Sequence, residues 1–178
     1  MNRPNSAEQR AIGLLQDLGF DEVLPVPIED VARRLGAAID YEPYEGEVSG
    51  MLYRSDGHTL IGVNSRHAKT RQRFTIAHEI GHLHMHKGTP MFIDRFVRVN
   101  RRDGVSNRQE VEANSFAAEL LMPRKLVARE VDRVLSKRRS ISPPDLAMIL
   151  AQSFGVSTEA MQYRLTNLGV LDPSPLID

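Results

Sequence analysis

Apolar residues near the start of the chain recur three or four positions apart, as they do on one face of an α-helix. Asn5 or Ser6 can cap a first helix that runs to Leu18, and Gly19 stands directly after its end. The same spacing predicts a second helix from Pro27 to Leu35. The chain is therefore expected to begin with two short helices.

Shorter apolar runs follow, and their period is close to two, as in β-strands. They predict extended segments over residues 38–44, 48–53 and 59–63. Asp56 and Gly57 stand between the last two segments and favour a tight hairpin turn. We therefore expect a small three-stranded sheet before the next helix.

Helical spacing resumes after the sheet and continues almost to the end of the chain. Helices are predicted over residues 74–83, 107–122, 125–135, 146–154 and 158–168. Residues 87–107 contain glycine, proline and many charges, so we expect a loop that can roof a cleft, with a short structured piece at residues 91–99. The predicted fold class is α+β, with N-terminal helices, a sheet packed on a helix, and a C-terminal helical region.

The chain has 178 residues, 41 % of them hydrophobic, and no cysteine. This length supports one substantial core, so we expect a single domain with a central core at residues 46–135, an N-terminal part at 1–45 and a C-terminal cap at 140–178. Without cysteine, a metal site must be built from histidine and carboxylate ligands. No apolar run reaches the roughly 18 residues that span a bilayer, so we expect a soluble, cytoplasmic protein.

Charge is balanced over the whole chain but unevenly distributed. Residues 1–50 hold four basic and ten acidic side chains, and the remainder holds nineteen basic and thirteen acidic ones. Basic residues concentrate at 95–102 and 124–139, but Glu130 and Asp132 interrupt the second group. Aromatic residues that could stack on bases are missing nearby, which argues against binding of nucleic acid.

The last two predicted helices have the spacing of a helix-turn-helix motif. The second of them brings only Arg164 as a positive charge in its body. Helices that read DNA carry several basic side chains, so we expect this pair to be a packing cap. A DNA-binding regulator stays as an alternative.

The run His78-Glu79-Ile80-Gly81-His82 has the pattern H-E-x-x-H and lies in the predicted helix at 74–83. Because His78 and His82 are one helical turn apart, both imidazoles can bind one metal ion, while Glu79 faces a water molecule that the metal activates. The pattern predicts a zinc-dependent hydrolase with one Zn²⁺ ion. The alternative is an amphipathic helix whose histidines only fill space.

Two further residues of this segment have expected roles. Gly81 costs roughly 1 kcal/mol relative to alanine inside a helix, so its presence predicts a close approach by another element. His86, four residues after His82, extends the same face. We expect it to pack or to orient a ligand rather than to bind the metal.

A catalytic zinc ion needs three protein ligands, and the helix at 107–122 offers Glu110, Glu112 and Glu119. Glu110 extends the apolar stripe of that helix, whereas Glu112 and Glu119 lie on another side. Asn114, one turn after Glu110, is predicted to be a buried amide that orients a ligand histidine. We predict Glu110 as the third ligand, with Glu112 as the alternative, and a solvated helix face for Glu119.

The segments His78–His86 and Glu110–Pro123 resemble the ImmA/IrrE family of bacterial zinc metallopeptidases. The likeness extends upstream through residues 50–53, 59–64 and 71–77, and downstream through residues 154–169. The resemblance implies a zincin-like fold. It also implies that the third ligand is the glutamate three residues before the Ala-Asn pair, which here is Glu110.

The same resemblance implies proteolysis of a transcriptional repressor or antitoxin, typically of the helix-turn-helix Xre type. Many members join a DNA-binding domain to the peptidase, and there is no room for one before Val26, so the substrate is expected to be a separate polypeptide. In zincin-type enzymes an edge strand beside the active-site helix pairs with the extended substrate. Thr59–Asn64 is our candidate for that strand, and an ordinary sheet strand is the alternative.

A toxin or interaction protein of the same fold, acting without proteolysis, is a further alternative. Glu79 argues against it, because a protein without catalytic function would not require the general base.

Overall fold

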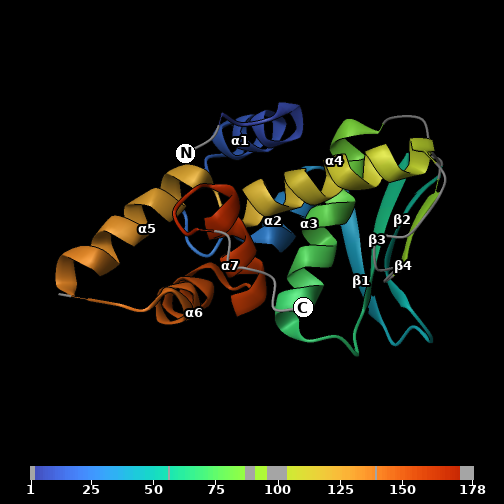
Figure 1. Cartoon of the computed structure of the whole chain (residues 1–178). Helices are drawn as coiled ribbons and strands as arrows, with labels where there is room; N and C mark the ends of the chain where they lie inside the picture. Colours follow the sequence, from blue (N-terminus) through green and yellow to red (C-terminus); the bar gives the residue numbers. More distant parts are fainter. Residues whose placement is uncertain (1–2, 56, 87–90, 96–103, 139, 173–178) are drawn as a thin grey trace.

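The computed structural model describes residues 3–55, 57–86, 91–95, 104–138 and 140–172 (Figure 1). In chain order, the elements of this part are α1 (Ser6–Leu18), α2 (Ile28–Arg34), β1 (Ala37–Glu42), β2 (Val48–Ser55), β3 (His58–Asn64), α3 (Lys69–Met85), β4 (Met91–Arg95), α4 (Gly104–Leu121), α5 (Arg124–Lys137), α6 (Pro143–Phe154) and α7 (Thr158–Asn167). The fold class is α+β, as predicted. None of these helices is both long and apolar enough to cross a lipid bilayer.

Helix α1 begins and ends where the sequence predicts. The side chain of Asn5 accepts a hydrogen bond from the backbone N–H of Glu8, and the carboxylate of Glu8 accepts one from the backbone N–H of Asn5. Gly19 follows the helix in the left-handed conformation, with φ of 70°. Because an N-cap stabilises a helix by about 1 kcal/mol, neighbouring residues alone account for the limits of α1.

The strands form one mixed sheet in the order β1-β3-β2-β4. The three predicted strands are present, and β4 adds a fourth at the edge, within the structured piece predicted at residues 91–99. The rest of that piece, and most of the loop predicted to roof a cleft, lie outside the described residues. The hairpin between β2 and β3 turns at Gly57, whose φ is 79°, whereas Asp56 lies outside the described residues.

The expectation that Thr59–Asn64 is an edge strand is wrong. This segment belongs to β3, which pairs in parallel with β1 on one side and antiparallel with β2 on the other. The tight hairpin places β2 beside β3, and β1 takes the remaining side, so no backbone groups are left there for an added strand. The edges of the sheet are β1 and β4.

One face of the sheet packs against the helices. Leu52, Ile61 and Val63 are fully buried in one core with Ile76 and Ile80 of α3. Figure 1 shows α3 beside the sheet, with the other helices on the same side of it. Burial of each such side chain contributes roughly 1.5 to 3 kcal/mol, so this core holds α3 firmly against β2 and β3.

The C-terminal helices lie close to their predicted positions, although α6 begins at Pro143 and not at residue 146. Ser142 and Ser157 cap α6 and α7, and Gly155 ends α6 in the left-handed conformation. In α5 the side chains of Leu126, Val127, Val131 and Val134 are buried, whereas Leu135 is 47 % exposed. Helix α6 contacts both α5 and α7. The two last helices therefore pack together as a helical pair.

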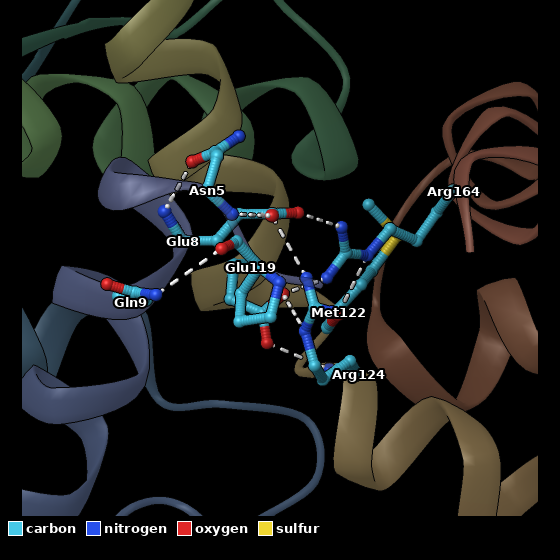
Figure 2. Close-up of polar contacts among 8 residues, drawn as sticks. Asn5, Glu8, Gln9, Glu119, Met122, Arg124 and Arg164 are labelled. Atoms are coloured by element: carbon cyan, nitrogen blue, oxygen red, sulfur yellow. Dashed lines mark hydrogen bonds and ion pairs between the residues drawn. The ribbon is translucent and has the colours of Figure 1, made fainter. Parts of the chain in front are cut away.

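Glu119 is fully buried, which corrects the solvated helix face predicted for it. Its carboxylate pairs with Arg164 of α7 and with Arg124 at the start of α5, and Arg164 also pairs with Glu8 of α1 at 2.9 Å (Figure 2). The cations come from helices that are distant in the sequence, so spacing along α4 does not reveal them. Arg164 is buried in this network, which removes it from any nucleic-acid surface.

Candidate metal centre

Helix α3 places two imidazoles on one face. His78 and His82 are one turn apart, and their Nε2 atoms lie 3.0 Å from each other. Both residues are buried, because α3 packs against the sheet and also against α4. The side chains converge on one point, as the H-E-x-x-H spacing predicts.

Gly81 allows α4 to approach this part of α3 closely. A Cβ atom at Gly81 would lie 3.2 Å from Cα of Ala113 and 3.3 Å from Cδ1 of Phe116. These distances are tighter than ordinary packing contacts, and one of them is to backbone. The close approach predicted from this glycine is confirmed, and the element that approaches is the helix that carries Glu110.

Glu110 completes a cluster of three residues that could hold a metal ion. Its carboxylate oxygens lie 3.1 Å from Nε2 of His78 and 3.4 Å from Nε2 of His82. Around a tetrahedral zinc ion, with bonds of about 2.0 to 2.1 Å, ligand atoms are about 3.3 Å apart, so the three donors fit such an ion. The side chain of Glu110 is 41 % exposed, so solvent reaches the cluster from this side.

The surroundings favour protonation states that bind a cation. Burial lowers the pKa of His82 despite the opposing effect of Glu110, which favours the neutral imidazole. Burial by itself would raise the pKa of Glu110, but the contacts of its carboxylate with the imidazoles of His78 and His82 outweigh this effect and hold that pKa well below its usual range. A neutral imidazole and an ionised carboxylate are the forms that coordinate metals.

Glu79, the predicted general base, is fully buried where α3 meets β2. A Cβ atom at Gly50 of β2 would lie 3.7 Å from Oε1 of Glu79, but only 2.8 Å from the carbonyl oxygen of Gly62 and 2.3 Å from Cγ2 of Thr75. A side chain at position 50 would therefore force α3 and β2 apart. Gly50 lies within the segment that carries the family resemblance, and its lack of a side chain lets Glu79 lie close to the sheet.

The Nδ1 atoms of the two clustered histidines face away from Glu110 and contact other polar groups. Nδ1 of His78 lies 3.0 Å from Oδ1 of Asn114, so the predicted contact of this amide with a ligand histidine is present. Asn114 is exposed, however, and not buried as predicted. Nδ1 of His82 lies 3.0 Å from Nδ1 of His86.

Glu112, the alternative third ligand, lies outside the three-residue cluster. Its Oε2 atom is 3.2 Å from Nε2 of His86, and its Oε1 atom accepts a hydrogen bond from Nε of Arg108 at 3.0 Å. Hydrogen bonds from His86 and Arg108 hold the pKa of Glu112 below its ordinary value. The spacing of His86 after His82 predicts that the two histidines share a face, but it does not predict this contact with Glu112 on another helix.

Arg54 of β2 holds the end of α3, a role that the sequence analysis missed. Its guanidinium group donates hydrogen bonds to the carbonyl oxygens of His82, at 2.9 Å, and His86, at 3.0 Å. Cations near the C-terminus of a helix satisfy carbonyl groups that have no partner within the helix. No feature of the sequence around residue 54 indicated this contact, because it joins elements that are not adjacent in the chain.

Comparison with known proteins agrees with this picture. A family model described as the IrrE N-terminal-like domain matches residues 32–166, which is well over half of the chain. The matched span includes the sheet, α3 and α4, and thus all three clustered residues. No curated protein matches the chain.

Proposed function

Because the chain belongs to the family of IrrE N-terminal-like peptidase domains, we propose that it is a zinc-dependent endopeptidase in which His78, His82 and Glu110 hold the metal. The observation that carries the proposal is the convergence of two imidazoles and one carboxylate, whose donor atoms lie within 4.8 Å of one another. Nitrogen and oxygen ligands in this combination suit zinc, and three of them leave a coordination position open.

The chemistry follows from this set of groups. When bound, zinc supplies Lewis acidity, which lowers the pKa of a water molecule toward neutrality and polarises the scissile carbonyl group. Glu79 acts as the general base: its carboxylate takes a proton from the attacking water and passes it to the nitrogen of the leaving amine. Its burial at the contact of α3 with β2 keeps bulk water from competing for that proton.

We place the substrate among separate transcriptional repressors or antitoxins of the helix-turn-helix Xre type, as the resemblance to the ImmA/IrrE family implies. The charge distribution supports a basic partner. The first fifty residues carry four basic and ten acidic side chains, a net charge of −6. A DNA-binding protein presents a basic surface that would be attracted to this part of the chain.

Metal analysis of single variants tests the site. We expect His78→Ala and Glu110→Ala to lose bound zinc, because each removes one of three ligands, and Glu79→Gln to retain it. Glu159→Ala, which removes an exposed carboxylate of α7, is the control for loss of a glutamate from a helix. Stoichiometric zinc in Glu110→Ala, together with its loss in Glu112→Ala, would overturn the ligand assignment.

Cleavage of a candidate repressor tests the reaction. The zinc-loaded protein is incubated with a candidate repressor of the Xre type, and mass spectrometry identifies the products. We expect cleavage by the wild type and by Glu159→Gln, and none by Glu79→Gln, which carries the same chemical change at the proposed base. Full biological activity of Glu79→Gln would instead favour an interaction protein that acts without proteolysis.

A further inference from the structure

A series of hydrogen-bonding groups leads from His82 to the surface of the protein, away from Glu110. Nδ1 of His82 is 3.0 Å from Nδ1 of His86, and Nε2 of His86 is 3.2 Å from Oε2 of Glu112. Both histidines are buried, whereas the carboxylate is partly exposed and also pairs with Arg108. The proposed zinc site and its chemistry make no use of His86 or Glu112.

The hydrogen positions in this series follow from the chemistry of its members. An ionised carboxylate only accepts hydrogen bonds, so Nε2 of His86 must carry the hydrogen that it shares with Glu112. A neutral imidazole carries a single ring N–H, so Nδ1 of His86 is then an acceptor. Nδ1 of His82 must therefore donate to it. The consequence is that Nε2 of His82 keeps its lone pair. This atom lies 3.0 Å from Nε2 of His78 and 3.4 Å from a carboxylate oxygen of Glu110, which is longer than an ordinary N–H···O hydrogen bond.

We propose that His86 and Glu112 are positioning residues, which hold His82 in the tautomer and orientation that present Nε2 to the metal. The inference rests on the proposed metal site and adds to it the means by which one ligand is prepared before the metal binds. Groups that fix a ligand histidine in this way typically change metal affinity by about 10- to 100-fold when they are removed.

The position of His86 is also determined by its backbone. His86 ends α3, with φ of −107° and ψ of 70°, and its N–H donates to the carbonyl oxygen of His82 at 3.0 Å. Arg54 of β2 binds the carbonyl oxygens of both residues. Because these contacts involve only the backbone of α3, a change of the side chain at position 86 should leave the end of the helix in place.

His86 is not a fourth ligand. Its two ring nitrogens lie against His82 and Glu112, and the group of potential ligands found among the described residues consists of His78, His82 and Glu110 alone. The contacts of His86 therefore support a role that acts through His82, and not direct binding of the metal.

Two substitutions of His86 separate hydrogen bonding from packing. His86→Gln keeps an acceptor for His82 and a donor for Glu112, because the amide group offers both, whereas His86→Leu removes both at a similar volume. His84→Leu is the control, since it removes a histidine from the same end of α3 that packs on Phe116, with ring centroids 5.7 Å apart. Zinc affinity is measured by competition with a chromophoric chelator. The tautomer of His82 is read from ¹⁵N chemical shifts of the metal-free protein at mildly alkaline pH.

We expect His86→Leu to weaken zinc binding by about 10- to 100-fold and to give His82 a mixture of tautomers, while His86→Gln and His84→Leu stay close to the wild type. Equal losses in His86→Gln and His86→Leu would overturn the proposal, because packing alone would then explain them. An unchanged affinity and an unchanged tautomer in His86→Leu would overturn it as well.

The two measurements also separate this inference from the proposed function. A wild-type protein that binds no zinc would contradict the metal site, whereas the tautomer of His82 in the metal-free protein tests the positioning role by itself. If His86→Leu fails to fold, Glu112→Ala provides the same test from the partly exposed end of the series. A wild-type tautomer and wild-type zinc affinity in that variant would then contradict the proposal.

Discussion

Glu119 of α4 and Arg164 of α7 form an ion pair in the protein interior, although 45 positions separate them in the sequence. Glu8 and Arg124 join them, so that two carboxylates and two guanidinium groups from α1, α4, α5 and α7 meet in one network (Figure 2). The charges balance within it. Removal of one member would leave a buried charge without full compensation.

Glu119→Gln is accordingly expected to destabilise the protein by about 3 to 5 kcal/mol, the range observed when one partner of a buried ion pair is removed. The free energy of unfolding is measured by denaturant titration of the metal-free protein. Glu22→Gln is the matched control, because Glu22 pairs with Lys125 and Arg129 at the exposed surface. Ion pairs at the surface contribute little to the free energy of unfolding. Equal losses of unfolding free energy in the two variants would show that the buried network stabilises the protein no more than a surface ion pair does.

Stability is expected to decline in acid partly because of Glu8. Burial raises the pKa of Glu8, but the hydrogen bond from Asn5 and the charges of Arg164 and Arg124 outweigh it, so the pKa in the folded protein lies below the ordinary value of 4.5. The stability that this carboxyl contributes is fully present above its unfolded pKa and is lost as the pH falls through the lower, folded pKa.

Glu8→Gln should therefore lower the free energy of unfolding at neutral pH and make its decline between about pH 5 and pH 2 shallower than in the wild type. Denaturant titrations across this range measure both effects. Parallel curves for the two proteins would contradict the linkage to Glu8.

Gly50→Ala should force α3 away from β2. The new methyl group would meet Cγ2 of Thr75 and the carbonyl oxygen of Gly62, and overpacking of this kind typically costs about 1 to 3 kcal/mol. Peptidase activity should fall as well, since Glu79 lies next to this contact.

Gly13→Ala is the control. It lies at a helical position with no atom within 4 Å of the added Cβ, and it should stabilise the protein by roughly 0.5 to 1 kcal/mol. Unchanged stability and activity of Gly50→Ala would show that β2 can shift to accommodate the added methyl group without cost.

Zinc should stabilise the folded protein, because the cluster of ligands forms only when α3 and α4 are packed together. At a free zinc concentration of about 100 times Kd, the expected gain is about 2.7 kcal/mol, observed as a higher Tm that a chelator reverses. His78→Ala should abolish the gain, and His58→Ala, at the exposed hairpin, should not. A Tm that does not respond to zinc in the wild type would argue against a metal site.

The elements whose ends depend on neighbouring residues could be predicted from the sequence. Asn5 and Gly19 limit α1, and Ser142 and Gly155 limit α6, because capping requires only residues a few positions apart. The same holds for His78 and His82, whose spacing determines that they share a helix face.

Features that depend on distant segments could not be predicted in this way. The position of β3 inside the sheet follows from its pairing with β1, and the burial of Glu119 follows from Arg164 on another helix. Asn114 illustrates this limit: its place one turn after Glu110 follows from helix geometry, whereas its contact with His78 and its exposure depend on the packing around α4. The contact of Glu110 with the two histidines depends on the packing of α4 against Gly81.

The ion-pair network has a consequence for the choice of a minimal active fragment. The family match starts at residue 32, yet α1 lies before that point, contacts α4 and brings Glu8 to the guanidinium groups of Arg124 and Arg164. A polypeptide cut at the limits of the match would expose the apolar surface of α4 that α1 covers and would leave two cations sharing one carboxylate, that of Glu119. Helix α1 is therefore expected to belong to the same folding unit as the matched span, although it lies outside that span.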